Sequence, residues 1–389
     1  QCLEQLACYP AAAALWAAEI LPARAPHLQP GWIDQAMQET GMVWAGLEKE
    51  QALFAYETDL ELIQEDTNDK DALLSSRNVL DALFPDASAR YPFSSLLAKS
   101  GFAPGDLIRS LWRAVWEGRV SNDTYSALQR GIETGFTAPD VVTPERRSTT
   151  SHMRGRRARF GAWRQATTYP GNWFRLPRLA IEENPIEAEE RRKDRVRILL
   201  DRYGILFREL LMRELEPFQW RSLFRTLRLM ELSGEILSGY FFEGVPGPQF
   251  ISHHAFRILQ RRLPETHIWW INALDPASLC GIQIDALKAI LPRRHESTHL
   301  VFRGKEIVLT SQKRGGELDV RLDVHDPVLP ECFGVLDHLL TRSLKPLRRI
   351  SVQTINGEDA PKSPFVDVLR TCFDVIVEPK AVILYRKRE

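Results

Sequence analysis

The sequence predicts an α+β protein assembled from repeated modules of helices and a short hairpin, with an antiparallel sheet near the C-terminal end. Three segments share one order: a helix that ends at a glycine, a short apolar strand, a turn and, usually, a second strand. After about residue 265, short apolar runs alternate with glycine turns, which is typical of strands. Three helices packed on a hairpin form a winged helix, so we expect winged helices in tandem and a small β-barrel.

The first repeat is expected within residues 1–68. Apolar spacing predicts a helix over residues 32–40, and Gly41 follows it. Glycine adopts the left-handed conformation that ends many helices, so the helix is expected to end there. The apolar runs 42–44 and 52–56 then predict the two strands of a hairpin.

The second repeat is expected within residues 69–140. Pro104 suits the first turn of a helix, because its missing N–H group has no partner there in any case. Gly118 is expected to end this helix, and residues 119–121 form the next strand.

The third repeat, residues 181–263, has the clearest pattern. Its main helix starts near Pro217 and ends at Gly234. Apolar side chains fall on one side of this helix at helical spacing, and basic side chains fall on the other. The basic set is expected to contact nucleic acid, because arginine binds both phosphates and guanine edges: Arg221, Arg225 and Arg228. The alternative is a helix that is charged only for solubility.

Residues 141–180 read as a linker rich in arginine and aromatic residues. Nine arginines and no lysine or acidic residue lie between Arg146 and Arg178. Such a segment can neutralise phosphates and stack on bases. The expected contacts are Arg154, Arg156, Arg157, Arg159, Trp163 and Trp173. The alternative is a solvated linker whose aromatic side chains dock onto neighbouring modules.

The C-terminal part is divided in two by its pattern. Short strands and glycine turns predict an antiparallel β-barrel over residues 264–328. Helices and strands then alternate over residues 329–389, which predicts a further α/β, winged-helix-like module.

Composition excludes several classes of protein. Lysine plus arginine and aspartate plus glutamate both number 51, so affinity for a polyanion must come from local patches. The 5 cysteines form no close pair, which argues against a disulfide framework and favours a reducing cytoplasm. No apolar run reaches the roughly 20 residues that a membrane-spanning helix needs. Because the chain starts at Gln1 within foldable sequence, we expect it to be a piece of a longer protein.

Signatures of catalysis are weak. No phosphate-binding glycine loop occurs, and the pair His295 and His299 has zinc-like spacing but no accompanying cysteine pair, so no metal site is predicted. If the chain acts on a base, it needs a carboxylate to position water or to stabilise a sugar cation. The weak candidates in predicted loops and turns are Asp275, Asp285 and Glu358, for each of which a turn cap is the alternative.

Several strings, in order along the chain, resemble one family. They lie at residues 21–24, 43–46, 111–118, 121–124, 154–159, 171–173, 201–204, 239–244, 275–281, 356–358 and 363–364. Together they resemble the long C-terminal extension of the bacterial large helicase-related protein, Lhr. The string at 275–281 departs from the family pattern after Ala277, so no catalytic role is carried over to this loop.

The resemblance implies a region of an ATP-dependent superfamily 2 DNA helicase involved in DNA repair. It also implies an architecture similar to that of the AlkZ-type DNA glycosylases and a tendency to form homo-oligomers. The ATPase motor is absent from this chain, so no cofactor is expected here, and ATP and magnesium belong to the missing motor domains. The implied location is the bacterial cytoplasm near the nucleoid, with the protein's own N-terminal helicase core as a partner and no membrane contact.

Three functions are therefore open. The main hypothesis is an accessory region that binds single-stranded or duplex DNA and assembles copies of the helicase. The first alternative is a DNA glycosylase that removes uracil or another damaged base after flipping it out of the duplex. The second alternative is a purely structural assembly domain without nucleic-acid contact.

Overall fold

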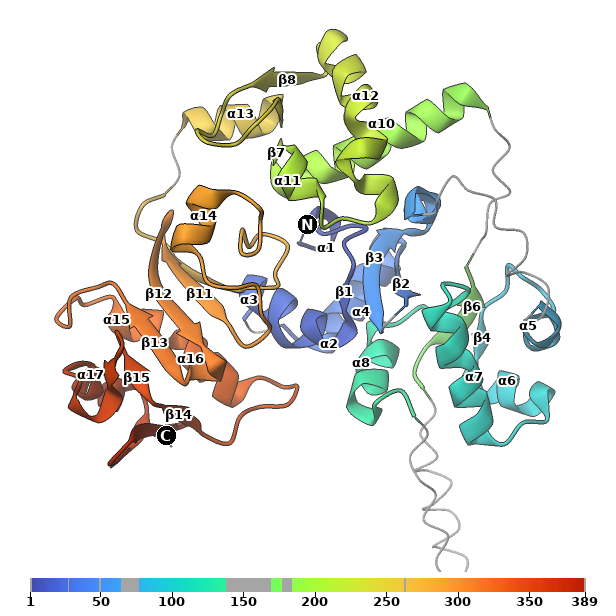
Figure 1. Cartoon of the computed structure of the whole chain (residues 1–389). Helices are drawn as coiled ribbons and strands as arrows, with labels where there is room; N and C mark the ends of the chain where they lie inside the picture. The colour runs from blue at the N-terminus through green and yellow to red at the C-terminus, as the bar shows by residue number, and fades with distance from the viewer. Residues whose placement is uncertain are drawn as a thin grey trace, which may run out of the picture. The chain divides into compact units, whose positions relative to one another are not determined.

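The computed structural model describes residues 2–26, 28–48, 50–63, 77–137, 169–176, 184–261 and 264–387, and the chain forms two compact units (Figure 1). The N-terminal unit comprises residues 7–14 and 29–182, and the C-terminal unit comprises residues 1–6, 15–28 and 183–389. The C-terminal unit therefore includes short helices from the start of the chain. These are α1 (Cys2–Gln5), the π-turn η1 (Trp16–Ile20), which follows α2 (Ala13–Leu15), and α3 (Leu21–Arg24).

The first module of the N-terminal unit confirms the predicted helix and hairpin. Gly41 adopts a left-handed conformation with φ of 73° and donates its N–H to the carbonyl of Met37, which ends the helix at Thr40. The strand that follows is almost entirely buried. The elements are β1 (Ala11–Ala12), α4 (Pro30–Thr40), β2 (Met42–Leu47), β3 (Gln51–Tyr56) and η2 (Glu57–Ile63).

The second module shares its core with the first. Trp44 of β2 donates its indole N–H to the carbonyl of Thr124 at 2.9 Å, and its ring stacks on Trp112 with centroids 6.0 Å apart. The elements of the second module are α5 (Arg77–Leu83), β4 (Tyr91–Pro92), α6 (Phe93–Ser100), α7 (Pro104–Trp116), β5 (Val120–Asn122), α8 (Tyr125–Thr134) and β6 (Asn172–Arg175). The indole hydrogen bond and the ring stacking hold the two modules in one packed body.

Gly46 on β2 provides a test of this shared core. A Cβ atom at Gly46 would lie 2.5 Å from both the carbonyl oxygen and a side-chain methyl group of Val115 on α7. We expect Gly46→Ala to destabilise the N-terminal unit by about 1–3 kcal/mol, because the backbone of α7 must move to admit the methyl group. Urea unfolding measures the effect. Gly31→Ala is the matched control, since nothing lies within 4 Å of the added atom, and equal stability of the two variants would contradict the prediction.

The arginine-rich segment is inserted within the second module. Strand β6 pairs with β5 on one side and with β4 on the other, so residues 123–171 connect two neighbouring strands of one sheet. Strand β6 lies inside the predicted linker 141–180, and that part of the prediction is wrong. Sequence periodicity could not place a four-residue strand whose partners β5 and β4 lie about 50 and about 80 residues earlier along the chain.

The third module, in the C-terminal unit, is a complete winged helix. The long helix α10 is capped at its start by the side chain of Asn184 and ends before Gly204, and a short strand and two short helical segments then precede the basic helix. The elements are α10 (Pro185–Tyr203), β7 (Ile205–Leu206), α11 (Arg208–Leu211), η4 (Glu216–Phe218), α12 (Trp220–Leu232), β8 (Ile236–Gly239), β9 (Gln249–Ser252) and α13 (His253–Gln260).

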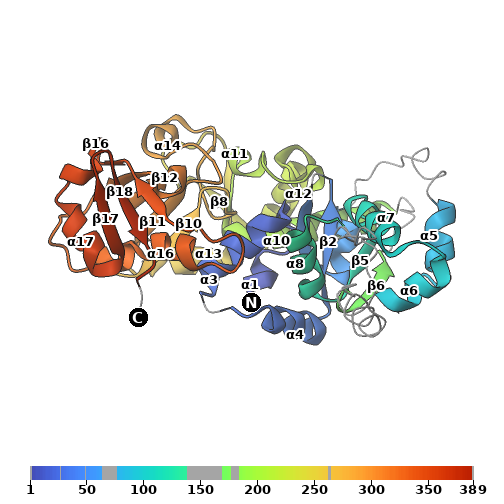
Figure 2. The ribbon, with the colours of Figure 1, turned by 90° about the horizontal axis from the view of Figure 1, so that it is seen from below.

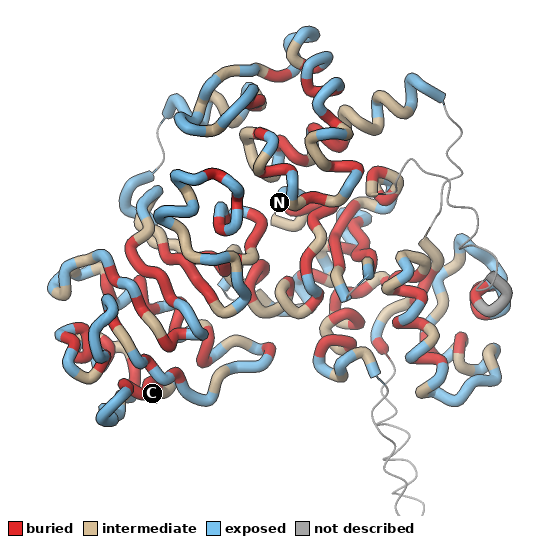
Figure 3. The backbone as a smooth tube through the Cα atoms, in the orientation of Figure 1, coloured by how far each residue is buried: buried red, intermediate tan, exposed pale blue. Residues whose placement is uncertain are grey.

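A six-stranded sheet follows, and its middle strands are largely buried (Figure 3). Its elements are β10 (Ile268–Asn272), α14 (Asp285–Ile290), β11 (His299–Arg303), β12 (Glu306–Gln312), η5 (Lys313–Gly315), β13 (Glu317–Val320), β15 (Thr354–Ile355) and β16 (Glu358–Asp359). The predicted antiparallel pairing is present from β10 to β13, whereas β15, which lies after residue 328, joins the sheet parallel to β13. In the described ranges its pairing ends at β10 and β16, so closure into a barrel stays a prediction.

The last module packs on this sheet through a common core. Buried side chains from Val301 to Leu384 form one hydrophobic cluster, so the predicted division at residue 328 does not separate two cores. Figure 2 shows the two C-terminal strands beside the last helix. The elements are α15 (Leu329–Cys332), α16 (Gly334–Thr341), β14 (Ile350–Val352), η6 (Ala360–Lys362), α17 (Phe365–Cys372), β17 (Asp374–Glu378) and β18 (Ala381–Tyr385).

One strand order recurs in these modules. In the described part of the chain, four three-stranded sheets place the third strand of the module between the first and the second: β1-β3-β2, β4-β6-β5, β7-β9-β8 and β14-β18-β17. This order, with a helix before the hairpin, is that of a winged helix. The predicted repetition is therefore present in the fold.

Candidate functional site

The helix α12 has one buried and one exposed face. Leu223, Leu227 and Met230 are fully buried, whereas the three predicted arginines are exposed. Spacings of four and three residues bring the guanidinium groups to one side of the helix. Those arginines are Arg221, Arg225 and Arg228. The structure therefore presents the predicted set together on the outer face of the third helix of a winged helix.

Two of these arginines contact acidic neighbours. Arg221 pairs with Glu216, and Arg228 pairs with Glu231. The side chains of the first pair are 67% and 52% exposed. Ion pairs as exposed as these contribute about 0–1 kcal/mol, so a phosphate can displace the carboxylate at little cost.

The charge of Arg225 acts on Glu189 of the helix α10. Burial works to raise the pKa of Glu189 there, but hydrogen bonds from Thr226 and Arg192, together with the charges of Arg192 and Arg225, lower it. Arg225 is thus close enough to influence an acidic group while remaining exposed to solvent.

The wing beside α12 presents an aromatic side chain on a fixed turn. The buried side chain of Gln249 accepts hydrogen bonds from the backbone N–H groups of Phe241 and Phe242, at 2.9 and 2.8 Å. It also donates to the carbonyl of Phe242. Tyr240, next to this clamp, is 88% exposed. A single buried glutamine therefore fixes the turn that carries the most exposed aromatic ring among the described large hydrophobic residues.

The arginine and aromatic set predicted in the linker is only partly described. Its first five members lie outside the described residues: Arg154, Arg156, Arg157, Arg159 and Trp163. Trp173 is described, and its assignment to nucleic-acid stacking is wrong. Its ring is fully buried and packs edge-on against Trp112 and Tyr169, both at 5.7 Å, so it belongs to the core of the second module.

The three weak catalytic candidates do not form one site. Asp275 is fully buried, Asp285 is fully exposed beside Lys288 at the start of α14, and Glu358 is exposed on β16. Strand β10, which precedes Asp275, and strand β16 form the two ends of the strand order of the six-stranded sheet. The arrangement gives no pair of carboxylates for acid and base catalysis.

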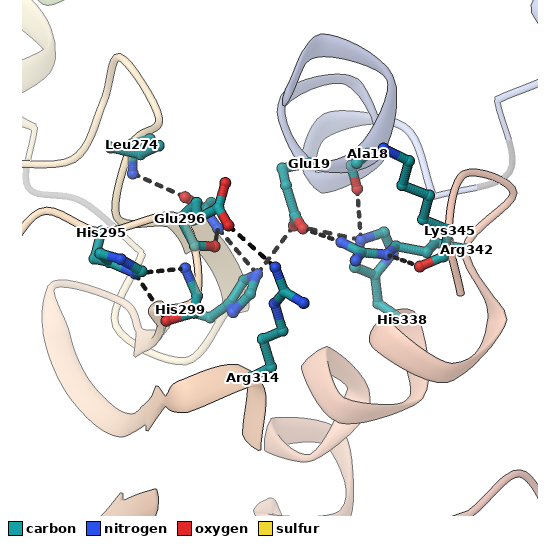
Figure 4. Close-up of polar contacts among 12 residues, drawn as sticks. Ala18, Glu19, Leu274, His295, Glu296, His299, Arg314, His338, Arg342 and Lys345 are labelled. Carbon is teal, nitrogen blue, oxygen red and sulfur yellow. Dashed lines mark hydrogen bonds and ion pairs between the residues drawn. The ribbon is translucent and has the colours of Figure 1, made fainter. Parts of the chain in front are cut away.

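A buried polar cluster joins the start of the chain to the sheet, and it was not predicted as a site. Glu19 of η1 is only 4% exposed. Figure 4 shows its carboxylate between His299 of β11 on one side and His338 and Arg342 on the other. Nε2 of His299 lies 3.0 Å from one carboxylate oxygen, and Arg342 donates to the other. Nε2 of His338 lies 3.5 Å from the carboxylate and 2.8 Å from the carbonyl of Ala18.

The electrostatics of this cluster keep Glu19 ionised. Burial works to raise its pKa, but hydrogen bonds and charges from His299 and His338 outweigh burial and lower the pKa to about 2. Such a carboxylate carries no proton to donate near neutral pH, and its lone pairs are already engaged. The cluster is therefore suited to holding segments together rather than to catalysis. The sequence signal for it was the single acid within the apolar run 11–20.

A second ion pair, with a buried carboxylate and a half-buried arginine, lies close along the chain. Arg24 binds both carboxylate oxygens of Asp275, at 2.6 and 2.9 Å, and Asp275 also accepts from the backbone N–H of Ala277. Bidentate pairs of this kind fix geometry as well as charge. Asp275 is therefore engaged in structure, which explains its burial in a loop.

Within the described ranges, no group of three or more His, Cys, Asp or Glu side chains has the arrangement of a metal site. Among the described helices, none combines the length and apolar character needed to cross a membrane.

The repeated strand order and the outward basic helix define this chain as a tandem winged-helix protein. Comparison with protein families matches two winged-helix domains of the large helicase-related protein, the fourth over residues 185–270 and the third over residues 1–63. The chain belongs to the Lhr family and corresponds to a C-terminal region of these proteins.

Two curated relatives cover most of the chain. The Lhr helicase/uracil glycosylase of Escherichia coli is 27% identical over 398 residues, covering 95% of this chain and 25% of the relative. The Lhr helicase/probable uracil glycosylase of Mycolicibacterium smegmatis is 25% identical over 310 residues, covering 72% of this chain and 19% of the relative. The chain thus spans a quarter or less of their length.

A solved structure resembles most of the chain weakly. The Streptomyces sahachiroi DNA glycosylase AlkZ is 12% identical with a TM-score of 0.45, and the match covers 86% of this chain and 89% of that one.

Proposed function

We propose that this region is a nucleic-acid-binding accessory part of an ATP-dependent Lhr-type DNA helicase that acts in DNA repair. The row of exposed arginines on α12 carries the proposal. In many winged and turn-linked helical modules, the third or recognition helix enters the nucleic-acid groove and the wing lies alongside it. Here both elements are present, with cations on the helix and an exposed tyrosine on the wing.

The charge arrangement supports contact with phosphates over solubility alone. The chain has no net charge, so its overall charge does not attract a polyanion. Three guanidinium groups on one helix face form a local positive patch, and the exposed carboxylate of Glu216 restrains Arg221 only weakly. Such groups release counterions when phosphates bind, which favours association at low salt.

Removing the three charges tests the proposal. We expect the combined variant Arg221→Gln, Arg225→Gln, Arg228→Gln to bind a short DNA at least about tenfold more weakly, because phosphate contacts are lost. The slope of log affinity against log salt should fall by about 2.7, or roughly 0.9 for each phosphate contact. Fluorescence anisotropy between about 50 and 200 mM salt measures both.

The control variant removes the same charge elsewhere on the C-terminal unit. Lys305, Arg314 and Arg321 are exposed in the turns at the ends of strands of the six-stranded sheet, so their replacement by glutamine changes net charge equally. If the two triple variants bind DNA alike, the affinity reflects overall charge, and α12 is not the binding surface.

We also propose that this region joins copies of the helicase and contacts its N-terminal motor, which would hold ATP and magnesium. Light scattering of the purified chain tests self-association. A chain that stays monomeric at all concentrations would leave binding as the only accessory role.

Uracil removal is the second candidate activity, because both curated relatives carry glycosylase in their names. The carboxylates Asp275, Asp285 and Glu358 offer no converging pair for it. Incubation with a uracil-containing strand, followed by alkali, tests the activity directly. If the purified chain causes strand cleavage, this region is itself a glycosylase.

A further inference from the structure

A surface pocket lies where α11 and α12 approach each other in the third module. It has a volume of about 300 Å³ and is lined by Arg208, Met212, Gln219, Trp220 and Arg221. Arg208 starts α11, and the two residues Trp220 and Arg221 start α12. Only Arg221 belongs to the arginine row already described. The pocket therefore extends that row toward the N-terminal end of the helix.

We propose that this pocket receives one unstacked nucleotide of a bound strand, with its base against Trp220 and Met212 and its phosphate near Arg208 and Arg221. The inference rests on the proposed nucleic-acid binding by α12 and names the form of the ligand. Ligand pockets in proteins range from about 300 to 1,000 Å³, so the size suits a single nucleotide better than a larger ligand.

The apolar side of the pocket is a preformed platform. The Trp220 ring packs against Phe224 with centroids 5.3 Å apart and against Phe250 at 5.9 Å. A ring held in this way loses little entropy when a base stacks on it. Met212 is 60% exposed, and its flexible thioether adapts to bases of different size. Stacking of this kind tolerates any sequence, because every base has a π-face.

The polar side of the pocket favours an anion. Two guanidinium groups come from two different helices, and the first turn of α12 adds the positive end of its dipole. Glu216 is the acidic group paired with Arg221, and both side chains are more than half exposed. A phosphate beside an aromatic and apolar wall is the chemistry of a nucleotide.

A photochemical crosslink tests the site in the whole chain. The probe is a short single strand that carries one 5-iododeoxyuridine, which crosslinks to a ring stacked against it. Irradiation followed by peptide mass spectrometry is expected to place the crosslink on Trp220. Crosslinks found only outside the pocket would overturn the proposal.

A matched pair of variants provides the second measurement. Met212→Glu places a carboxylate in the pocket, and Leu232→Glu makes the same charge change at the far end of α12, where the side chain is 78% exposed. We expect Met212→Glu to weaken single-strand binding about tenfold more than Leu232→Glu does, because one stacked base is lost. If the two variants weaken single-strand binding equally, the pocket proposal is contradicted.

The outcomes separate this inference from the proposed function. If the wild-type chain binds no DNA at low salt, both fail. If the triple arginine variant loses DNA binding, Met212→Glu and Leu232→Glu bind the single strand equally, and the crosslink lies outside the pocket, then only the pocket proposal is contradicted. A phosphoserine peptide that binds the wild type but not Met212→Glu, with no crosslink to the strand, would assign the pocket to a protein partner instead.

Discussion

Replacing Glu19 by leucine is expected to destabilise the C-terminal unit by about 3–5 kcal/mol. The substitution removes the common partner of His299, His338 and Arg342 in a site where the carboxylate is almost fully buried. A guanidinium group left without its carboxylate keeps the cost of burial and loses the compensating attraction. The size of the effect therefore comes mainly from the partners that stay behind.

Urea unfolding gives the change in free energy, and hydrogen exchange assigns it to a unit. Backbone protection is expected to fall around residues 15–28 and along β11, with the N-terminal unit unchanged. Glu39→Leu is the control, because Glu39 lies exposed on α4 and its carboxylate contacts Gln35. A Glu19 variant as stable as this control would mean that the cluster contributes nothing to folding.

Acid titration provides an independent signature of the same carboxylate. Its folded pKa of about 2 lies below the ordinary value of 4.5. A depressed pKa stabilises the fold above the unfolded value, and this contribution is lost as pH falls from about 4.5 to about 2. The difference corresponds to roughly 3 kcal/mol. The wild type should lose this stability on acidification, and the Glu19→Leu variant should not.

Replacing Glu214 by leucine is expected to destabilise the third module by a similar amount, about 3–5 kcal/mol. Glu214 and Arg202 are 0% and 1% exposed and meet at 2.7 Å, and the hydroxyl of Tyr203 donates to the same carboxylate. Burial works to lower the pKa of Arg202, but the charge of Glu214 raises it above its usual range. Without Glu214, a buried cation would stay charged.

The effect should appear in both stability and binding. Because Glu214 lies in the turn that leads to α12, its loss is expected to loosen the helix that carries the arginine row. Glu235→Leu is the control, since Glu235 pairs with Arg197 on the surface and such pairs contribute about 0–1 kcal/mol. If the two variants have the same unfolding midpoint, the buried pair does not stabilise the module.

The repeated architecture was predictable because it depends on local patterns. Gly41 and Gly118 both adopt left-handed conformations after helices, as glycine readily does. The arginine row on α12 followed from helical spacing, which fixes which side chains share a face. In these places a short window of sequence contains all the physical information that is needed.

The rest depends on contacts between distant segments. Glu19 meets His299 and Arg342 across about 280 and 323 positions, and periodicity carries no information at that separation. Trp173 stands in a basic, aromatic segment that is typical of a binding loop, yet its burial depends on Trp112 of helix α7. Composition identified this segment as basic and aromatic. Only the pairing of β6 shows where the chain rejoins the sheet of the second module.

Strand β6 brings the chain back to the sheet that contains β5, and this pairing has a consequence for the free energy of folding. Asp123 and Asn172 bind each other through backbone and side-chain contacts, at 3.0, 2.7 and 2.9 Å, so both ends of the intervening stretch are fastened to one sheet. The number of residues between them cannot set the distance between modules. Doubling the length of a flexible loop costs only about 0.6 kcal/mol of closure entropy, so residues added between these two ends would change the free energy of unfolding little. Evolution can therefore lengthen the chain between α8 and Tyr169, both of which pack in the core, while the framework around it keeps its geometry.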